Sequence, residues 1–116
     1  MKSLLTIIFC FVLFFVCSSQ TIRGKIVRIV DGDTLTILDS TNQQIKIRLY
    51  GIDCPEHGQD FSNVAKRFTS DLCFSQIAKV EVRDIDRNGR TVGIVWVHDS
   101  INVNLELLKA GLAWHY

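Results

Sequence analysis

Two short acidic clusters stand out in the sequence, each at a point where a turn is expected. The first is Asp31-Gly32-Asp33-Thr34 and the second is Asp53-Cys54-Pro55-Glu56. Carboxylates this close repel one another unless a cation lies between them, and hard cations take carboxylate oxygens, backbone carbonyls and water as ligands. If the two turns meet at one end of the fold, Asp33 and Asp53 would be placed to share one such ion.

Three further charged groups near these clusters suit a phosphodiester substrate. Glu56, in the second cluster, could hold a water and act as a general base. Arg48 comes shortly before that cluster, and Arg90 directly follows the Asn88-Gly89 turn. Because a guanidinium group binds two phosphate oxygens at once, the two arginines together would grip a phosphodiester.

Each of these features also has an ordinary structural interpretation. The string DGDT is common in hairpin turns, and Arg48 could simply occupy the solvent face of a strand. Arg90 could only decorate a hairpin, and Glu56 could interact with the dipole of a following helix. The remaining polar and aromatic candidates are interpreted as surface or packing residues (His57, His98 and His115) and as core residues (Trp96 and Trp114).

The elements that must position these residues are mostly short strands. Alternating, β-branched sequence predicts strands over residues 22–30, 34–38, 45–50, 79–84 and 92–97. Apolar residues at helical spacing predict an amphipathic helix over residues 60–75. A second helix is marked by Ile101, Leu105, Leu108 and Leu112, with Asn102 or Asn104 near its start and Gly111 near its end. This order predicts a mainly β, α+β domain: a five-stranded Greek-key barrel of the OB type with an inserted helix and a second helix.

The first 20 residues have the pattern of a secretory signal peptide. Lys2 precedes an apolar run from Leu4 to Cys17, and Ser18-Ser19-Gln20 supply small residues suited to a signal peptidase. The run is short for a membrane span, which needs about 20 residues. An uncleaved anchor and lipid attachment at Cys17 are the alternatives. We expect residues 1–20 to direct export and residues 21–116 to form one secreted or periplasmic domain, free of the membrane.

The remainder of the chain is globular in composition and balanced in charge. With Lys2 set apart, 12 Lys and Arg face 12 Asp and Glu, so binding of a polyanion must come from local placement of charge. Cys54 and Cys73 would allow one disulfide in an oxidising compartment. Cys73 falls on the apolar face of the predicted helix, which favours free thiols.

Four segments taken together resemble the thermonuclease family, the staphylococcal nuclease-like domains. They are IVDGDTLTI, IKIRLYGIDCPEHGQ, DRNGRTVGIV and NLELLKAGLAWHY. The resemblance runs from about Thr21 to Tyr116 and implies an OB-fold barrel and a calcium-dependent endonuclease that cleaves DNA and RNA to 3′-phosphate products. Members usually continue past the last segment into another loop and helix, so the resemblance implies a C-terminally truncated domain.

The resemblance also implies roles for particular residues. Those roles are Arg48, Glu56 and Arg90 in catalysis, Asp33, Asp53 and the backbone carbonyl of Cys54 as calcium ligands, and Asp31 as a nearby acidic residue that shapes the metal site. As partners we expect single-stranded DNA and RNA, with the chain a monomer that has no stable protein partner. The alternative is an OB-fold module that binds nucleic acid or protein without catalysis, against which the intact charged trio argues.

Overall fold

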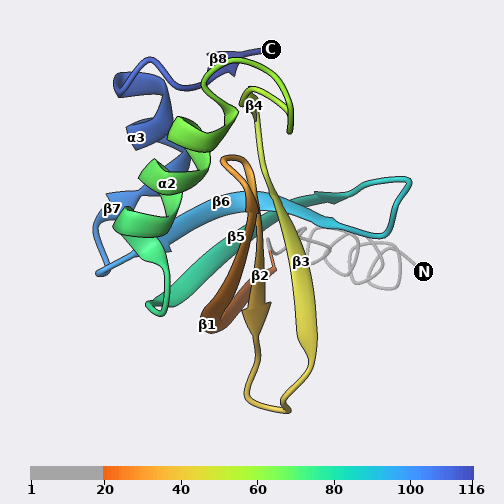
Figure 1. Cartoon of the computed structure of the whole chain (residues 1–116). Helices are drawn as coiled ribbons and strands as arrows, with labels where there is room; N and C mark the ends of the chain where they lie inside the picture. Colours follow the sequence, from red (N-terminus) through yellow and green to blue (C-terminus); the bar gives the residue numbers. More distant parts are fainter. Residues whose placement is uncertain (1–19) are drawn as a thin grey trace, which may run out of the picture.

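The computed structural model describes residues 20–116, so the predicted signal peptide lies outside the described residues apart from Gln20. The described chain is mostly β-strand with two helices (Figure 1). In chain order the elements are β1 (Thr21–Asp31), β2 (Thr34–Leu38), β3 (Gln44–Leu49), β4 (Ile52–Asp53), α2 (Ser62–Cys73), β5 (Ile77–Ile85), β6 (Thr91–Val97), β7 (Ile101–Asn102), α3 (Val103–Lys109) and β8 (Trp114–His115). Neither helix in this part of the chain has the length and apolar character that a membrane crossing requires.

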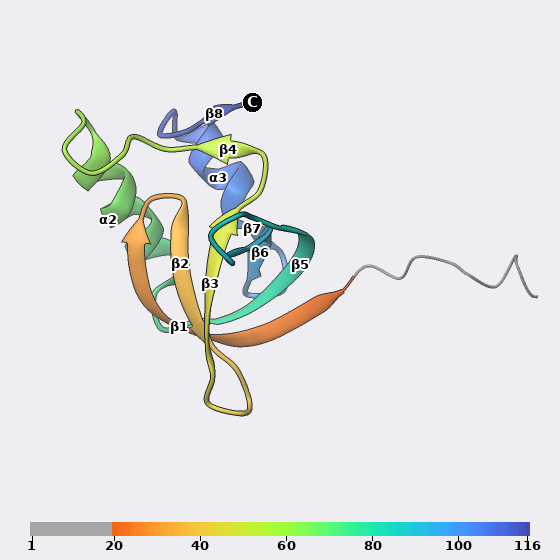
Figure 2. The same ribbon diagram turned by 90° about the vertical axis from the view of Figure 1, so that its right-hand side faces the viewer.

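Five of the strands close into a barrel. Antiparallel pairing gives the order β3-β2-β1-β5-β6, and a parallel pairing of β3 with β6 closes the ring. The register of β1 against β2 shifts between Ile26 and Arg28 and again between Ile29 and Asp31. Such irregularities bend a strand, and Figure 2 shows β1 curving from β2 towards β5. The mainly β architecture with an OB-type barrel and two helices confirms the fold expected from the sequence.

Side chains of β2 and β3 point alternately into the barrel and to its outer face. Leu35 is paired with Ile47, and both are fully buried. Side chains of a strand point alternately to the two faces, so the neighbouring pair, Thr34 with Arg48, lies on the outer face. The rest of the buried apolar core comes from all the larger elements and includes Ile26, Ile37, Leu49, Ala65, Val80, Val95, Val103 and Leu107.

The C-terminal segment differs from the sequence-based expectation. The second helix ends at Lys109, and Gly111, with φ of 71°, turns the chain away from it. Leu112 and Trp114 therefore lie beyond the helix, and Trp114 pairs with Asp53 in a two-stranded sheet of β8 and β4. Asp53, in a cluster where a turn was expected, therefore lies in a short strand. The assignment of Trp114 to the core is wrong, because so short an edge strand leaves the side chain 53% exposed; Trp96 is partly buried.

Helix α2 packs against the β1–β2 turn through Gly32. A Cβ atom on Gly32 would lie 2.8 Å from the Cβ of Ala65 and 3.0 Å from the Sγ of Cys54. The carbonyl of Gly32 also accepts a 2.6 Å hydrogen bond from the hydroxyl of Thr69. The missing side chain therefore allows the turn, the helix and the loop that contains Cys54 to come together.

We expect Gly32→Ala to destabilise the fold by about 1–3 kcal/mol, the usual cost of overpacking. Ala65 lies on a helix and cannot retreat from the new methyl group without weakening the bond from Thr69. Denaturant unfolding measures the change, with Ser40→Ala in the exposed β2–β3 turn as the control. Equal stability of the two variants would show that α2 does not depend on this close approach.

Candidate active site

One end of the barrel carries a polar concavity where turns from distant parts of the chain meet. Its volume is about 670 Å³. All seven residues that the sequence singled out contribute to its lining: Asp31, Asp33, Arg48, Asp53, Cys54, Glu56 and Arg90. The fold therefore brings together groups that lie as much as 59 positions apart in the chain.

Asp33 joins the β1–β2 turn to the loop after β4. Its side chain is buried, and one carboxylate oxygen accepts a 3.0 Å hydrogen bond from the hydroxyl of Thr34. The other oxygen accepts a 2.8 Å bond from the backbone N–H of Cys54, and the backbone carbonyl of Asp33 accepts from the N–H of Leu49. The carboxylate is thus held in place by hydrogen bonds to both of its oxygens.

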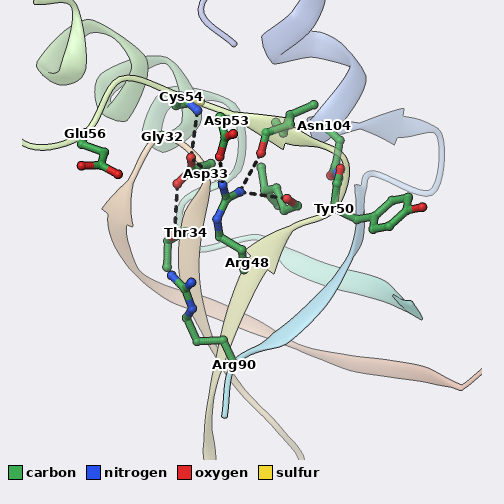
Figure 3. Close-up of polar contacts among 12 residues, drawn as sticks. Gly32, Asp33, Thr34, Arg48, Tyr50, Asp53, Cys54, Glu56, Arg90 and Asn104 are labelled. Atoms are coloured by element: carbon green, nitrogen blue, oxygen red, sulfur yellow. Dashed lines mark hydrogen bonds and ion pairs between the residues drawn. The ribbon is translucent and has the colours of Figure 1, made fainter. Parts of the chain in front are cut away.

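The guanidinium group of Arg48 lies between two of the carboxylates (Figure 3). Its Nη1 donates to the backbone carbonyls of Leu49 and Ile52, at 2.9 and 2.8 Å. Its Nη2 lies 3.4 Å from Oδ2 of Asp33 and is hydrogen-bonded to Oδ1 of Asp53. The loops therefore direct both carboxylates towards one positive charge.

This donor set fits a calcium ion. Asp33 and Asp53 already converge on a single cation, the guanidinium of Arg48, and their oxygens are the hard ligands that calcium prefers. Within residues 20–116, no group of three or more His, Cys, Asp and Glu side chains is arranged to hold an ion. Calcium takes six to eight oxygens, so an ion here would draw its other ligands from backbone carbonyls, water and substrate.

Arg90 is oriented by Asp86, a residue that the sequence analysis missed. The Nε of Arg90 donates to Oδ2 of Asp86 at 2.7 Å, and its backbone N–H donates to Oδ1 at 2.9 Å. Burial raises the pKa of Asp86, but hydrogen bonds from Arg90 and Asn88 outweigh it and keep the pKa below its ordinary value. Asp86 is therefore ionised at neutral pH and holds the stem of Arg90. Figure 3 shows the guanidinium directed towards Thr34.

Glu56 stands apart from this network. Its side chain is exposed on the loop beyond Cys54, and its backbone N–H donates to the amide oxygen of Gln59 at 2.7 Å. The same concavity is lined by His57, which is exposed as expected, and by Trp114, which was expected in the core. The carboxylate of Glu56 is consequently the acidic group of the site that is most open to solvent and to an incoming water.

Cys54 takes part in the site through its backbone. Its thiol is buried, and burial together with the negative charge of Asp33 raises its pKa to about 12. Burial raises the pKa of Cys73 to about 12 as well, and both residues are free thiols. Neither sulfur is ionised near neutral pH, so the backbone groups of Cys54 remain its contribution to the chemistry.

Asn104 is a second positioning residue that the sequence analysis did not identify. Its buried side chain accepts a 3.1 Å bond from the N–H of Val95 and donates to the carbonyls of Tyr50 and Gly93, at 3.0 and 3.2 Å. It thereby ties α3 to the barrel and to the segment that leads into β4 and Asp53. The sequence offered it only as an alternative helix cap, a role that Asn102 performs instead.

Comparison with known proteins points to one family. The family model described as staphylococcal nuclease homologue matches residues 46–116. An uncharacterized endonuclease of Haemophilus influenzae is 39% identical over 116 residues, which cover 99% of this chain and 65% of the relative. A micrococcal nuclease of Shigella flexneri is 39% identical over 102 residues, covering 81% and 58%. A thermonuclease of Staphylococcus intermedius is 35% identical over 107 residues, covering 83% and 62%. The chain thus spans about three-fifths of the length of these relatives.

We expect Asn104→Ala to destabilise the protein by at least about 2 kcal/mol. The change leaves the N–H of Val95 and the carbonyl of Tyr50 without their partner, whereas the carbonyl of Gly93 keeps its bond from the N–H of Tyr50; each unpaired buried group costs about 1–3 kcal/mol. The matched control is Asn102→Ala, which removes one helix cap and should cost about 1 kcal/mol. Denaturant unfolding compares the two, and an equal loss would mean that the contacts of Asn104 add nothing beyond capping.

Proposed function

The chain belongs to the family of staphylococcal nuclease homologues, and from this premise we propose that it is an endonuclease that hydrolyses phosphodiester bonds of DNA and RNA. The observation that carries the proposal is the meeting of two arginines and an exposed glutamate with a pair of converging carboxylates in one concavity. Three relatives that each align with at least 81% of this chain are named as a nuclease or an endonuclease.

Glu56 is proposed as the general base. Its exposed carboxylate can accept a proton from a water that attacks phosphorus, in line with the bond that breaks. The other carboxylates of the site are less suited to this task. Asp33 is buried and already accepts two hydrogen bonds, and Asp53 is paired with Arg48.

Arg48 and Arg90 are proposed to bind the equatorial phosphate oxygens, where negative charge grows in the transition state. The two contacts of Nη1 of Arg48 with backbone carbonyls fix its position. Its Nη2, which contacts the carboxylates of Asp33 and Asp53 and no backbone carbonyl, is the nitrogen that would donate to a phosphate oxygen. Arg90 is fixed through Nε by Asp86, which leaves its two terminal nitrogens for the substrate.

Calcium is proposed to be held by Asp33, Asp53 and the carbonyl of Cys54. Asp31 is proposed as a nearby acidic residue that shapes this metal site. Calcium, when bound, would supply positive charge beside a phosphate oxygen. Following the family resemblance, we further propose that the bond to the 5′ oxygen is cleaved, which leaves 3′-phosphates. We also propose that residues 1–20 direct the enzyme out of the cytoplasm. Outside the cytoplasm it acts as a monomer and prefers single-stranded substrates.

We expect cleavage of single-stranded DNA by the full chain to require calcium. The protein supplies few carboxylates here, and magnesium demands a smaller octahedral shell with retained waters, so it should support far less activity. Gel assays with calcium, with magnesium and with chelator measure this. Undiminished cleavage in excess chelator would overturn the calcium site, and binding without cleavage in every condition would favour a non-catalytic OB-fold module.

We expect Arg90→Lys to lower kcat about a hundredfold, the scale of losing one transition-state donor. Lysine keeps the charge but has no planar fork to span two oxygens. Arg87→Lys, an exposed arginine in the same hairpin, is the matched control and should keep the full rate.

Glu56→Gln removes the general base and should lower kcat about 10²–10⁴-fold. Its control, Glu106→Gln on α3, should leave kcat unchanged. Full activity of either site variant would exclude the role given to that residue.

A further inference from the structure

Two more concavities continue from the candidate active site along the outside of the barrel. The first lies between β1–β3 and the β5–β6 hairpin, and it shares Arg90 with the active-site concavity. The second lies between β1 and α2, and it shares Arg28 with the first. Helix α2 runs beside β1 in Figure 1. The three hollows therefore adjoin one another, at Arg90 and at Arg28, between the active site and α2.

Positive side chains line this path beyond the active site. We call them the basic track: Lys46, Arg28, Lys66 and Arg67. All four are exposed, and none is in a salt bridge within residues 20–116. No Asp or Glu side chain of the described chain lines either of the two further hollows. In a protein whose total charge is close to zero, this is a local concentration of unpaired cations.

The strand register sets the spacing of the track. Thr36 pairs with Arg28 on one side and with Lys46 on the other, so these three form one row across the outer face. That row lies two residues from the pair of Thr34 with Arg48. Two residues of a β-strand span about 7 Å. This distance is comparable to the spacing of successive phosphates in an extended single-stranded nucleic acid. The row is thus placed to contact a phosphate next to one held by Arg48.

An exposed aromatic ring lies at the far end of the track. Phe74, at the end of α2, lines the same hollow as Arg28, Lys66 and Arg67, and is 49% exposed. Cationic grooves with exposed aromatic rings are typical of surfaces that bind single strands, because bases stack on the rings while the cations contact phosphates. A small free anion would contact neither the aromatic ring nor the whole length of the track, whereas a nucleic acid would contact both.

We propose that the basic track binds the sugar-phosphate backbone of a single-stranded nucleic acid whose scissile phosphate lies at Arg48 and Arg90. The proposal rests on the nuclease function proposed above. The track passes from β3 across β1 to α2, and a duplex, with a persistence length of about 50 nm, would have to be bent at a cost in free energy to follow these elements around the barrel. A flexible single strand follows them without that cost, so the track favours single-stranded over double-stranded substrate.

The test compares two variants of equal charge. One carries Arg28→Gln, Lys66→Gln and Arg67→Gln; the control carries Arg23→Gln, Lys79→Gln and Lys109→Gln, which lie off the track. Fluorescence anisotropy of the full chain with chelator measures the affinity for single-stranded DNA and RNA of about 16 nucleotides, the upper site size of one OB fold. Because chelator is present, binding is read without cleavage.

For the track variant we expect at least about a tenfold loss of affinity for both nucleic acids, since the contacts are to phosphates. The slope of log affinity against log salt should fall by about 2, at about 0.7 for each lost contact with a single strand. In cleavage assays with calcium, KM for the oligonucleotide should rise while kinetics on a dinucleotide stay unchanged. Phe74→Leu should weaken binding without altering the salt slope.

The two proposals fail separately. Equal affinities and salt slopes for the track and control variants would overturn the track, even if cleavage is normal. Track-dependent binding in a chain that cleaves nothing would overturn the nuclease function and leave the binding surface standing. A loss of affinity for duplex DNA as large as that for single strands would overturn the assignment to single strands.

Discussion

The hydrogen bond from the backbone N–H of Cys54 to the carboxylate of Asp33 is the contact on which the arrangement of this site depends. It joins a hairpin turn to a loop 21 positions later in the chain. With that bond in place, the loop positions Asp53 beside Arg48 and projects Glu56 over the concavity. Gly32 makes the junction sterically possible, because α2 and Cys54 occupy the space where any larger residue would place its Cβ. The local geometry therefore serves both packing and the proposed chemistry.

Charge is balanced over the whole chain, but the acidic site and the basic track beside it have different charged residues. Asp31, Asp33, Asp53 and Glu56 gather at one end of the barrel, and the unpaired cations follow the outer face away from it. Such a division allows a nearly neutral protein to orient a polyanion. An acidic end alone would repel a nucleic acid, and a uniformly basic surface would bind it in any register. Cations beside an acidic site would place one phosphate at the acidic end.

Much of this arrangement could be read from the sequence, because strand alternation and turn residues are local signals. The strand over 34–38 was predicted to the residue, and all seven candidate site residues do share one concavity. Other features depend on distant contacts. The pairing of β4 with β8 involves two residues on each side, too few to leave a pattern. Asn104 looks like a helix cap in sequence, and only the folded barrel shows which carbonyls it reaches. Trp114 was assigned to the core wrongly because its pairing with Asp53 in β4 also depends on a contact between distant parts of the chain.

The two arginines of the site differ in how much each contributes to the stability of the fold in addition to its proposed role in catalysis. Arg48 is largely buried with Asp33, and it also satisfies two backbone carbonyls. Removing one partner of a buried pair costs far more than the pair contributes, because the other charge is left without compensation. The two carboxylates that would hold an ion are thus held close together by their contacts with Arg48. Arg90 pairs with Asp86 on a more exposed hairpin, where an ion pair contributes little to stability. Its guanidinium can therefore serve a substrate at little cost to the fold, so the effects of substitution at Arg90 report on chemistry, whereas those at Arg48 also report on folding.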